Sequence, residues 1–148
     1  MEIETKYFGK KTINKSEIIT FENGIPGFLD EKEFVLIPFT DDGVYEMMQS
    51  VQTPDLAFIV TNPFYFFQDY EFDLEDNVVE QLEIEKAEDI KVIVILTIQD
   101  PFNNTTANLQ APVIINTKNN KAKQVILNNE SYTTKHRLFK ELPANQKG

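Results

Sequence analysis

Several residue types on which enzyme sites depend are absent or scarce in this sequence. There is no cysteine, so disulfides and thiolate metal sites are excluded, and the single histidine, His136, rules out zinc sites built from several histidines. The five glycines are scattered, and neither a G-x-G-x-x-G fingerprint nor a Walker loop occurs, which leaves nucleotide binding unsupported. No apolar run approaches the roughly 20 residues that span a bilayer, and the first residues lack a basic-then-apolar signal. We therefore expect a cytoplasmic protein without cofactor or membrane contact.

The chain is short, and acidic residues outnumber basic ones. Its 148 residues fit one domain with a single core. It carries 14 Lys and Arg against 24 Asp and Glu, a net charge of −10. Because phosphate contacts need basic side chains, this balance disfavours direct binding of nucleic acid and favours a basic partner.

The negative charge is concentrated in the middle of the chain. Residues 21–117 carry 19 acids and three Lys, whereas residues 118–148 carry seven basic and two acidic side chains. The densest block, residues 71–89, holds nine acids and a single Lys. Neighbours within a Debye length of roughly 8 Å add their fields, so this block should form a strongly negative face.

The apolar residues occur in short runs rich in Phe, Val, Ile and Tyr, which suit a pleated surface. The pattern predicts a mostly β protein, a small antiparallel barrel or sandwich with one short helix, because no long helical segments separate the runs. The expected strands are 2–8, 18–21, 34–39, 44–50, 56–61, 91–99, 106–110, 112–116 and 123–128.

Two segments stand out within this pattern. Residues 73–82 place Leu74, Val78 and Leu82 four residues apart, with acids in the first turn, which predicts the helix. Residues 92–96 are apolar at every position, which indicates a central strand buried on both faces. We expect one domain over residues 1–139, followed by a flexible tail, 140–148.

Clustered carboxylates are the remaining candidates for catalysis or metal binding. Pairs such as Asp41–Asp42 and Glu88–Asp89 lack the spacing of a calcium loop, and none of the three serines lies in a G-x-S-x-G setting. We interpret the carboxylates as a solvated face and expect neither catalytic nor metal-binding residues.

Seven segments over residues 3 to about 139 belong together by their order and spacing: Phe21–Phe28, Met48–Ser50, Asp55–Phe58, Pro63–Asp73, Thr106–Asn116, Lys123–Leu127 and Tyr132–His136. Taken in this order, they resemble the FliW family of flagellar assembly factors. The resemblance implies a small β-barrel-like fold and a non-enzymatic regulator. It also implies two partners that cannot be held together: the RNA-binding dimer CsrA, which represses translation of flagellin mRNA, and flagellin itself. Cytoplasmic flagellin would sequester this protein, and its export would free the protein to capture CsrA. We expect the free protein to be a monomer.

The charge pattern suggests how such a protein could act on RNA indirectly. An RNA-binding dimer presents a basic surface, so the acidic block would be steered towards it and, once docked, would repel incoming phosphates. The residues to which we assign this role are Glu71, Asp73, Glu75, Asp76, Glu80 and Glu83.

Two loops carry apolar groups where strand alternation does not require them, and we expect these loops to supply partner-binding anchors. The candidates are Ile25, Pro26 and Phe28 in the first loop, and Phe102, Asn103, Asn108 and Leu109 in the second.

Two other functions remain open at this point. One is an export chaperone for flagellin without control of CsrA, in which the aromatic segment Phe64–Tyr70 would hold an amphipathic helix in a groove. The other is an enzyme with a carboxylate pair, which would show carboxyl groups with raised pKa values converging in a pocket.

Overall fold

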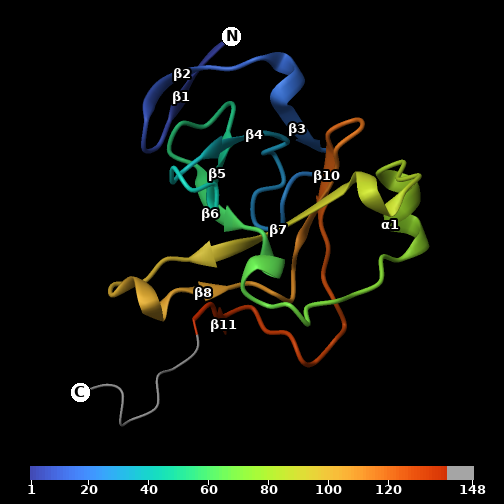
Figure 1. Ribbon diagram of the computed structural model, residues 1–148. Coiled ribbons are helices and arrows are strands. Elements are labelled where there is room, and N and C mark those ends of the chain that lie inside the picture. The colour runs from blue at the N-terminus through green and yellow to red at the C-terminus, as the bar shows by residue number, and fades with distance from the viewer. Residues whose placement is uncertain (140–148) are drawn as a thin grey trace.

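The computed structural model describes residues 1–139, and the predicted tail, 140–148, lies outside this range. Within the described residues, eleven strands and one α-helix follow one another (Figure 1). They are β1 (Glu2–Thr5), β2 (Gly9–Thr12), β3 (Ile18–Phe21), β4 (Glu33–Pro38), β5 (Tyr45–Ser50), β6 (Ala57–Thr61), α1 (Asp76–Gln81), β7 (Ile90–Thr97), β8 (Thr106–Ala107), β9 (Val113–Asn116), β10 (Lys121–Gln124) and β11 (His136–Arg137).

Seven strands close into a barrel in the order β7-β6-β5-β4-β3-β10-β9, and the pairing of β7 with β9 completes the ring. The mostly β prediction is thus confirmed, with the barrel as the architecture. Every neighbouring pair is antiparallel except β3 and β10, which run parallel. A closed ring with an odd number of strands cannot alternate direction throughout. The β3–β10 pair is therefore the one parallel exception in the predicted antiparallel barrel.

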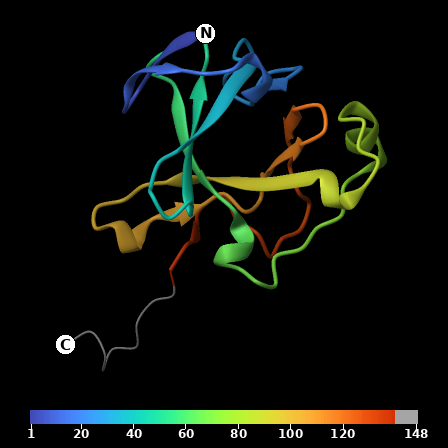
Figure 2. The ribbon, with the colours of Figure 1, turned by 45° about the horizontal axis from the view of Figure 1, so that its top comes forward.

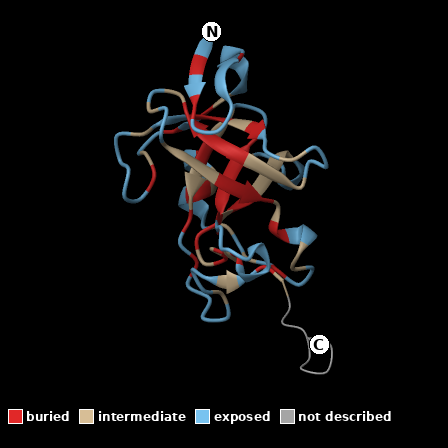
Figure 3. Cartoon of the chain, turned by 90° about the vertical axis from the view of Figure 1, so that its left-hand side faces the viewer, coloured by how far each residue is buried: buried red, intermediate tan, exposed pale blue. Residues whose placement is uncertain are grey.

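The barrel interior is filled by alternate residues of all seven strands, because successive side chains of a strand point to opposite faces. Phe21 and Phe34 meet edge to face there, with ring centroids 5.5 Å apart. The buried interior set comprises Ile19, Phe21, Phe34, Met48, Val60, Ile93, Val113, Ile115 and Ala122, joined by Ile25 from a loop. The red strands at the centre of Figure 3 correspond to this closed core.

A second apolar cluster lies on the outside of the barrel, where the β1–β2 hairpin, α1 and the C-terminal segment cover it. Figure 2 shows the hairpin at one end, α1 beside the barrel, and β8 and β11 at the other end. Strand β7 contributes to both clusters, with Ile93 inside and Val94 outside, each fully buried. It pairs with β6, β8 and β9, which confirms the prediction of a central strand buried on both faces.

Three local features differ from the sequence prediction. The expected strand 2–8 is instead a hairpin, because Thr5 Oγ1 donates to the carbonyl of Gly9 (2.7 Å) and turns the chain there. Helix α1 begins at Asp76 rather than residue 73, although Leu74 still packs on the outer cluster. Strand β11 was not predicted, since only its pairing with β8 defines it.

Candidate partner-binding surfaces

The loop between β3 and β4 forms a closed turn with Pro26 and Gly27 at its tip. Ile25 and Phe28 exchange both main-chain hydrogen bonds (3.3 and 2.7 Å), which directs the Ile25 side chain into the barrel. Ile25 is only 2% exposed, so the expectation that it is a surface anchor was wrong. Pro26 is exposed, and Phe28 is 43% exposed, with its ring 5.7 Å from that of Phe58. Phe28 is therefore the accessible aromatic of this loop.

Gly24 makes this loop conformation possible, and replacing it should damage the fold more than replacing Gly27. Both have positive φ, but a Cβ on Gly24 would lie 2.6 Å from the carbonyl carbon of Leu29, whereas one on Gly27 would meet nothing within 4 Å. We expect Gly24→Ala to lower the free energy of unfolding by about 3 kcal/mol and Gly27→Ala by about 1 kcal/mol, the cost of the backbone alone. Urea denaturation measures both, and equal losses would contradict the steric argument.

The second predicted loop contributes one accessible aromatic, Phe102. Phe102 lies in a 3-10 turn, Phe102–Asn104, and is 42% exposed. Its ring contacts Tyr45 and Phe139, each at 5.6 Å between centroids. Asn103 is exposed beside it, and its carbonyl accepts a long hydrogen bond from Arg137 (3.4 Å). Phe102 and Asn103 therefore remain candidates for binding.

Leu109 and Asn108 serve the fold instead of the surface. Leu109 is 1% exposed, so the prediction of an exposed anchor was wrong there too. Its carbonyl accepts a hydrogen bond from the Tyr70 hydroxyl (2.6 Å), and burial raises the pKa of Tyr70, which keeps this donor protonated. The Oδ1 atom of half-buried Asn108 accepts from the main-chain N–H of Ala111 (3.0 Å). Both residues fix the loop that follows Phe102.

The two accessible aromatics belong to different surfaces. Phe28 contacts Phe58, whereas Phe102 contacts Tyr45, which pairs with Thr61. Phe58 and Thr61 are three residues apart on β6, and an odd separation places their side chains on opposite faces of the sheet. A single small partner epitope would therefore not cover both aromatics at once.

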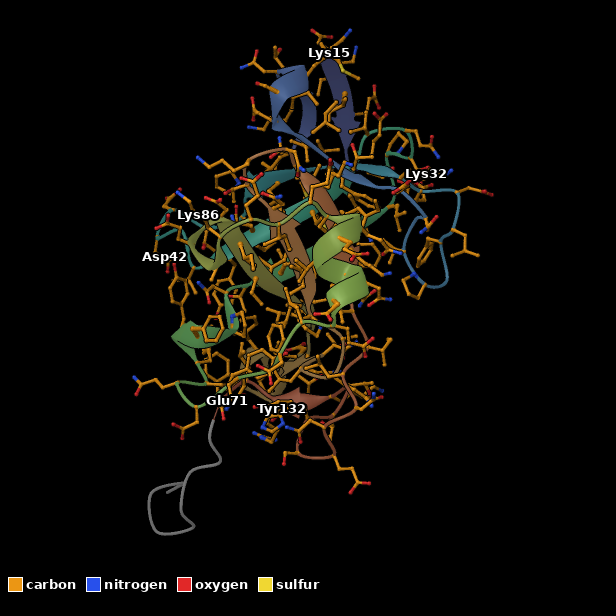
Figure 4. All side chains as sticks on the ribbon, turned by 90° about the vertical axis from the view of Figure 1, so that its right-hand side faces the viewer. Lys15, Lys32, Asp42, Glu71, Lys86 and Tyr132 are labelled. Carbon is orange, nitrogen blue, oxygen red and sulfur yellow. The ribbon has the colours of Figure 1, made fainter. Side chains whose placement is uncertain are left out.

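Residues 71–85, the larger part of the acidic block, form a rigid strap that crosses the outside of the barrel (Figure 4). We call this segment the acidic strap. Its apolar side chains, Phe72, Leu74, Val78, Leu82 and Ile84, pack on the outer cluster. All six predicted steering residues, Glu71, Asp73, Glu75, Asp76, Glu80 and Glu83, are exposed. The alternation thus separates a packing face from a charged face along the same segment.

Both ends of the acidic strap are held by hydrogen bonds to its main chain. At its start, the Tyr132 hydroxyl accepts from the N–H of Glu71 (3.0 Å) and donates to its carbonyl (3.1 Å); the two residues are labelled together in Figure 4. At its end, buried Asn116 donates to the carbonyls of Leu82 (2.8 Å) and Glu83 (3.1 Å). The main chain of the strap is therefore anchored at both ends.

One of the six acids is already neutralised by a neighbouring lysine. Glu83 ends α1 in a left-handed conformation (φ 56°), with Ile84 N–H donating to the Val79 carbonyl (3.0 Å). The Lys121 ammonium contacts its carboxylate and holds the pKa of Glu83 below its usual value. Within residues 1–139 the other five acids, and Glu85 in the same strap, have no ion-pair partner, so these six carboxylates dominate the field of the strap.

Sequence reasoning missed one exposed aromatic group, at the tip of the β1–β2 hairpin. Tyr7 and Phe8 lie beside Phe39, with ring centroids 5.7 and 5.9 Å away. Lys6 lies over the ring of Tyr7 and Lys11 over that of Phe8. The signal was present in the sequence as two aromatics flanked by lysines at the turn, residues 6–11.

Neither a metal site nor a membrane span emerges from the part of the chain described. Among residues 1–139, no group of three or more His, Cys, Asp or Glu side chains is arranged to hold a metal ion. None of the helices described in that range is long and apolar enough to cross a membrane.

These features define a class of small barrel proteins, in which seven strands close through one parallel pair and an acidic strap crosses the outer face. The chain belongs to the FliW family of flagellar assembly factors, because the family model, described as FliW protein, matches residues 2–138.

Similar proteins agree with this assignment. The chain is 52% identical over 136 residues to the flagellar assembly factor FliW of Bacillus subtilis (strain 168), covering 92% of this chain and 95% of the relative. It is 53% identical over 141 residues to that of Geobacillus thermodenitrificans (strain NG80-2), covering 95% and 97%. A crystal structure of the flagellar assembly factor FliW superposes with a TM-score of 0.90 at 51% identity, covering 95% of this chain and 99% of that one.

Proposed function

We propose that this flagellar assembly factor is a non-enzymatic antagonist of the translational repressor CsrA and is itself sequestered by cytoplasmic flagellin. Free protein would bind CsrA and release flagellin mRNA for translation. Flagellin that accumulates in the cytoplasm would occupy the protein, return CsrA to the mRNA and stop further synthesis. Export of flagellin would reset the cycle.

The observation that carries this proposal is the acidic strap, with its six exposed carboxylates that have no ion-pair partner within residues 1–139. Opposite charge on an RNA-binding dimer would accelerate encounter, because electrostatic steering raises association rates above those of neutral pairs. Since Tyr132 and Asn116 fix the ends of the strap, its field is presented without the entropy cost of ordering a loose segment.

The same strap supports a way of displacing RNA. Once the protein is docked, carboxylates beside the RNA-binding surface would raise the energy of incoming phosphates, so binding of this protein and of RNA would be negatively coupled. Such coupling is reciprocal: RNA must weaken the binding of this protein to CsrA by the same factor.

A gel shift of flagellin leader RNA on CsrA tests the complete cycle. Titrating in this protein should release the RNA, and adding purified flagellin afterwards should restore the RNA complex. Bovine serum albumin, also an acidic protein, serves as the control for non-specific charge and should release no RNA. If RNA stays on CsrA although this protein is in molar excess, the proposed antagonism is wrong.

A second candidate function, an export chaperone for flagellin alone, is supported by an aromatic-lined cavity at the β8–β11 end. The cavity has a volume of about 630 Å³, and its lining includes Tyr65, Phe66, Phe67, Tyr70 and Tyr132. Tyr65 is 61% exposed, so part of this aromatic surface is open to a helix of a client. In the gel-shift experiment a chaperone of this kind would bind flagellin and leave the CsrA–RNA complex unchanged.

A further inference from the structure

The barrel has a seam where the parallel pairing of β3 and β10 stops. The two strands share only the pairs Thr20↔Lys121 and Phe21↔Ala122. After Phe21 the chain turns away, as the N–H of Gly24 donates to the Phe21 carbonyl (2.9 Å). The β10 side of the seam therefore extends beyond the end of β3.

Beyond Ala122 the β10 segment stays extended along the other neighbour. The N–H of Val125 donates to the Pro112 carbonyl (2.9 Å) and that of Leu127 to the Gln110 carbonyl (2.8 Å). In an antiparallel pair alternate residues turn their main-chain groups to opposite sides, so Gln124 and Ile126 face the side that β3 has left.

The main-chain groups of Gln124 and Ile126 form an open edge. In the range 1–139, no hydrogen bond reaches the N–H or C=O of either residue. Ile126 is 58% exposed, which agrees with an uncovered edge. Such a row of free donors and acceptors is a template for one more strand.

A groove of about 490 Å³ lies along this seam as far as Gln124, and Ile126 lines the adjoining hollow beside Glu71 and Asp73. One wall is the β3–β4 loop, with Pro26 and Leu29, and the other is the end of α1, with Gln81 and Leu82; Figure 1 shows α1 on the β10 side of the barrel. Leu29 is 66% exposed. The loop wall is fixed by the hydrogen bonds of its turn, so the groove does not have to be ordered by its occupant.

We propose that this seam binds an extended peptide segment of a partner protein, which adds to the sheet as a strand beside Gln124 and Ile126. Free main-chain donors and acceptors specify an extended backbone. Walls on both sides of the edge favour a single extended strand over the broad surface of a second barrel. The segment places an apolar side chain against Leu29.

Charge in the groove selects the type of side chain at a second position of the bound peptide segment. Lys121 is paired with Glu83, whereas Lys123 donates to the neutral Gln81, with 2.6 Å between Nζ and Oε1, and has no carboxylate partner within residues 1–139. The lysine without a carboxylate partner takes an acidic side chain of the bound segment, which distinguishes this site from a purely apolar groove.

A defined peptide tests the geometry. The probe is acetyl-Val-Glu-Val-Thr-Val-Thr-amide, titrated into labelled protein and followed by the NMR amide signals of Gln124 and Ile126. Strand addition shifts both signals, and N-methylation of the peptide amides that face β10 weakens binding at least about tenfold, the value of roughly one hydrogen bond, whereas N-methylation of the alternate amides does not. Lysine in place of glutamate in the peptide also weakens binding.

Two variants of one residue separate the main-chain edge from the side chain. Ile126→Pro removes the free N–H without breaking a hydrogen bond of the structure, and Ile126→Thr removes the apolar side chain but keeps that N–H. We expect at least about tenfold weaker binding of the probe only for the proline variant, with melting temperatures of both close to the wild type. If the proline variant unfolds, the N-methylated peptides decide the question on wild-type protein.

The proposal fails if neither amide signal shifts at about 5 mM peptide, or if both N-methylated sets bind equally well. It also fails if sedimentation shows that Ile126→Pro abolishes a dimer of this chain, because the edge would then be occupied by a second copy. None of these outcomes depends on binding of CsrA or flagellin, so the proposed function stands or falls separately.

Discussion

Gln49→Leu should lower the free energy of unfolding by about 3 kcal/mol, because it removes the partner that a fully buried amide provides to several buried and part-buried main-chain groups. Gln49 is fully buried on β5. Its Oε1 accepts from the N–H of Lys6 (2.9 Å), and its Nε2 lies 3.1 to 3.3 Å from the carbonyls of Ser50, Thr53, Pro54 and Leu56. One side chain thus joins the β1–β2 hairpin to the loop between β5 and β6. Thermal melting should show a loss of roughly 6–12 °C.

The chain offers a matched control three residues away. Gln52 is exposed, and its amide makes one hydrogen bond, to the Asp30 carbonyl (3.2 Å). Gln52→Leu makes the same chemical change and should cost no more than about 0.5 kcal/mol. Hydrogen exchange should also show faster exchange in the β1–β2 hairpin for the Gln49 variant only. Equal losses at the two positions would show that burial of the Gln49 amide does not matter.

The central strand could be predicted from sequence, whereas closure of the barrel could not. An apolar side chain at every position of residues 92–96 signals burial on both faces, and this signal is local. Closure rests on β7 pairing with β9 and on β3 pairing with β10, the latter about 100 residues apart along the chain. No local pattern encodes such partners, and the parallel pair follows only once the ring is known to have seven strands.

Local sequence pattern is also insufficient to predict which candidate anchor residues are exposed. Sequence pattern identifies the loops that carry Ile25, Phe28, Phe102 and Leu109, but not which of these side chains point inward. Reciprocal hydrogen bonds turn Ile25 into the barrel, and the hydroxyl of Tyr70, 39 positions away, fixes the loop at Leu109. The two phenylalanines stay accessible because their rings lie against Phe58 and Tyr45 at the surface.

For the acidic strap, composition predicted the charge and the structure supplied its distribution. The nine acids of residues 71–89 are visible in the sequence, and the structure exposes all of them except Asp89, which is half-buried. Pairing of Glu83 with Lys121 could not be read from the sequence, because it depends on where β10 passes the end of α1. The effective charge of the strap is therefore set by tertiary structure.

Neutralising five of the six unpaired acids of the strap should slow association with CsrA by about ten- to a hundredfold at low salt. The substitutions are Glu71→Gln, Asp73→Asn, Glu75→Gln, Asp76→Asn and Glu80→Gln. Each position is exposed, and each substitution removes the charge but keeps the size of the side chain. Since added salt screens the same field, the salt dependence of the association rate should flatten in this variant. Stopped-flow measurements at several ionic strengths give both quantities, and melting temperature confirms that the fold is retained.

A second variant with the same net charge decides whether the association rate depends on the charge of the strap or on the charge of the whole molecule. It carries Glu2→Gln, Glu4→Gln, Asp30→Asn, Glu33→Gln and Asp55→Asn, five exposed acids outside residues 71–85. If steering comes from the local field, this control should keep most of the association rate and its dependence on salt, because charges farther away than a Debye length of about 8 Å are screened. Equal slowing by the two variants would mean that only net charge acts, and the strap would lose its assigned role. Full displacement of RNA by the strap variant, once bound, would separately refute repulsion of phosphates as the means of release.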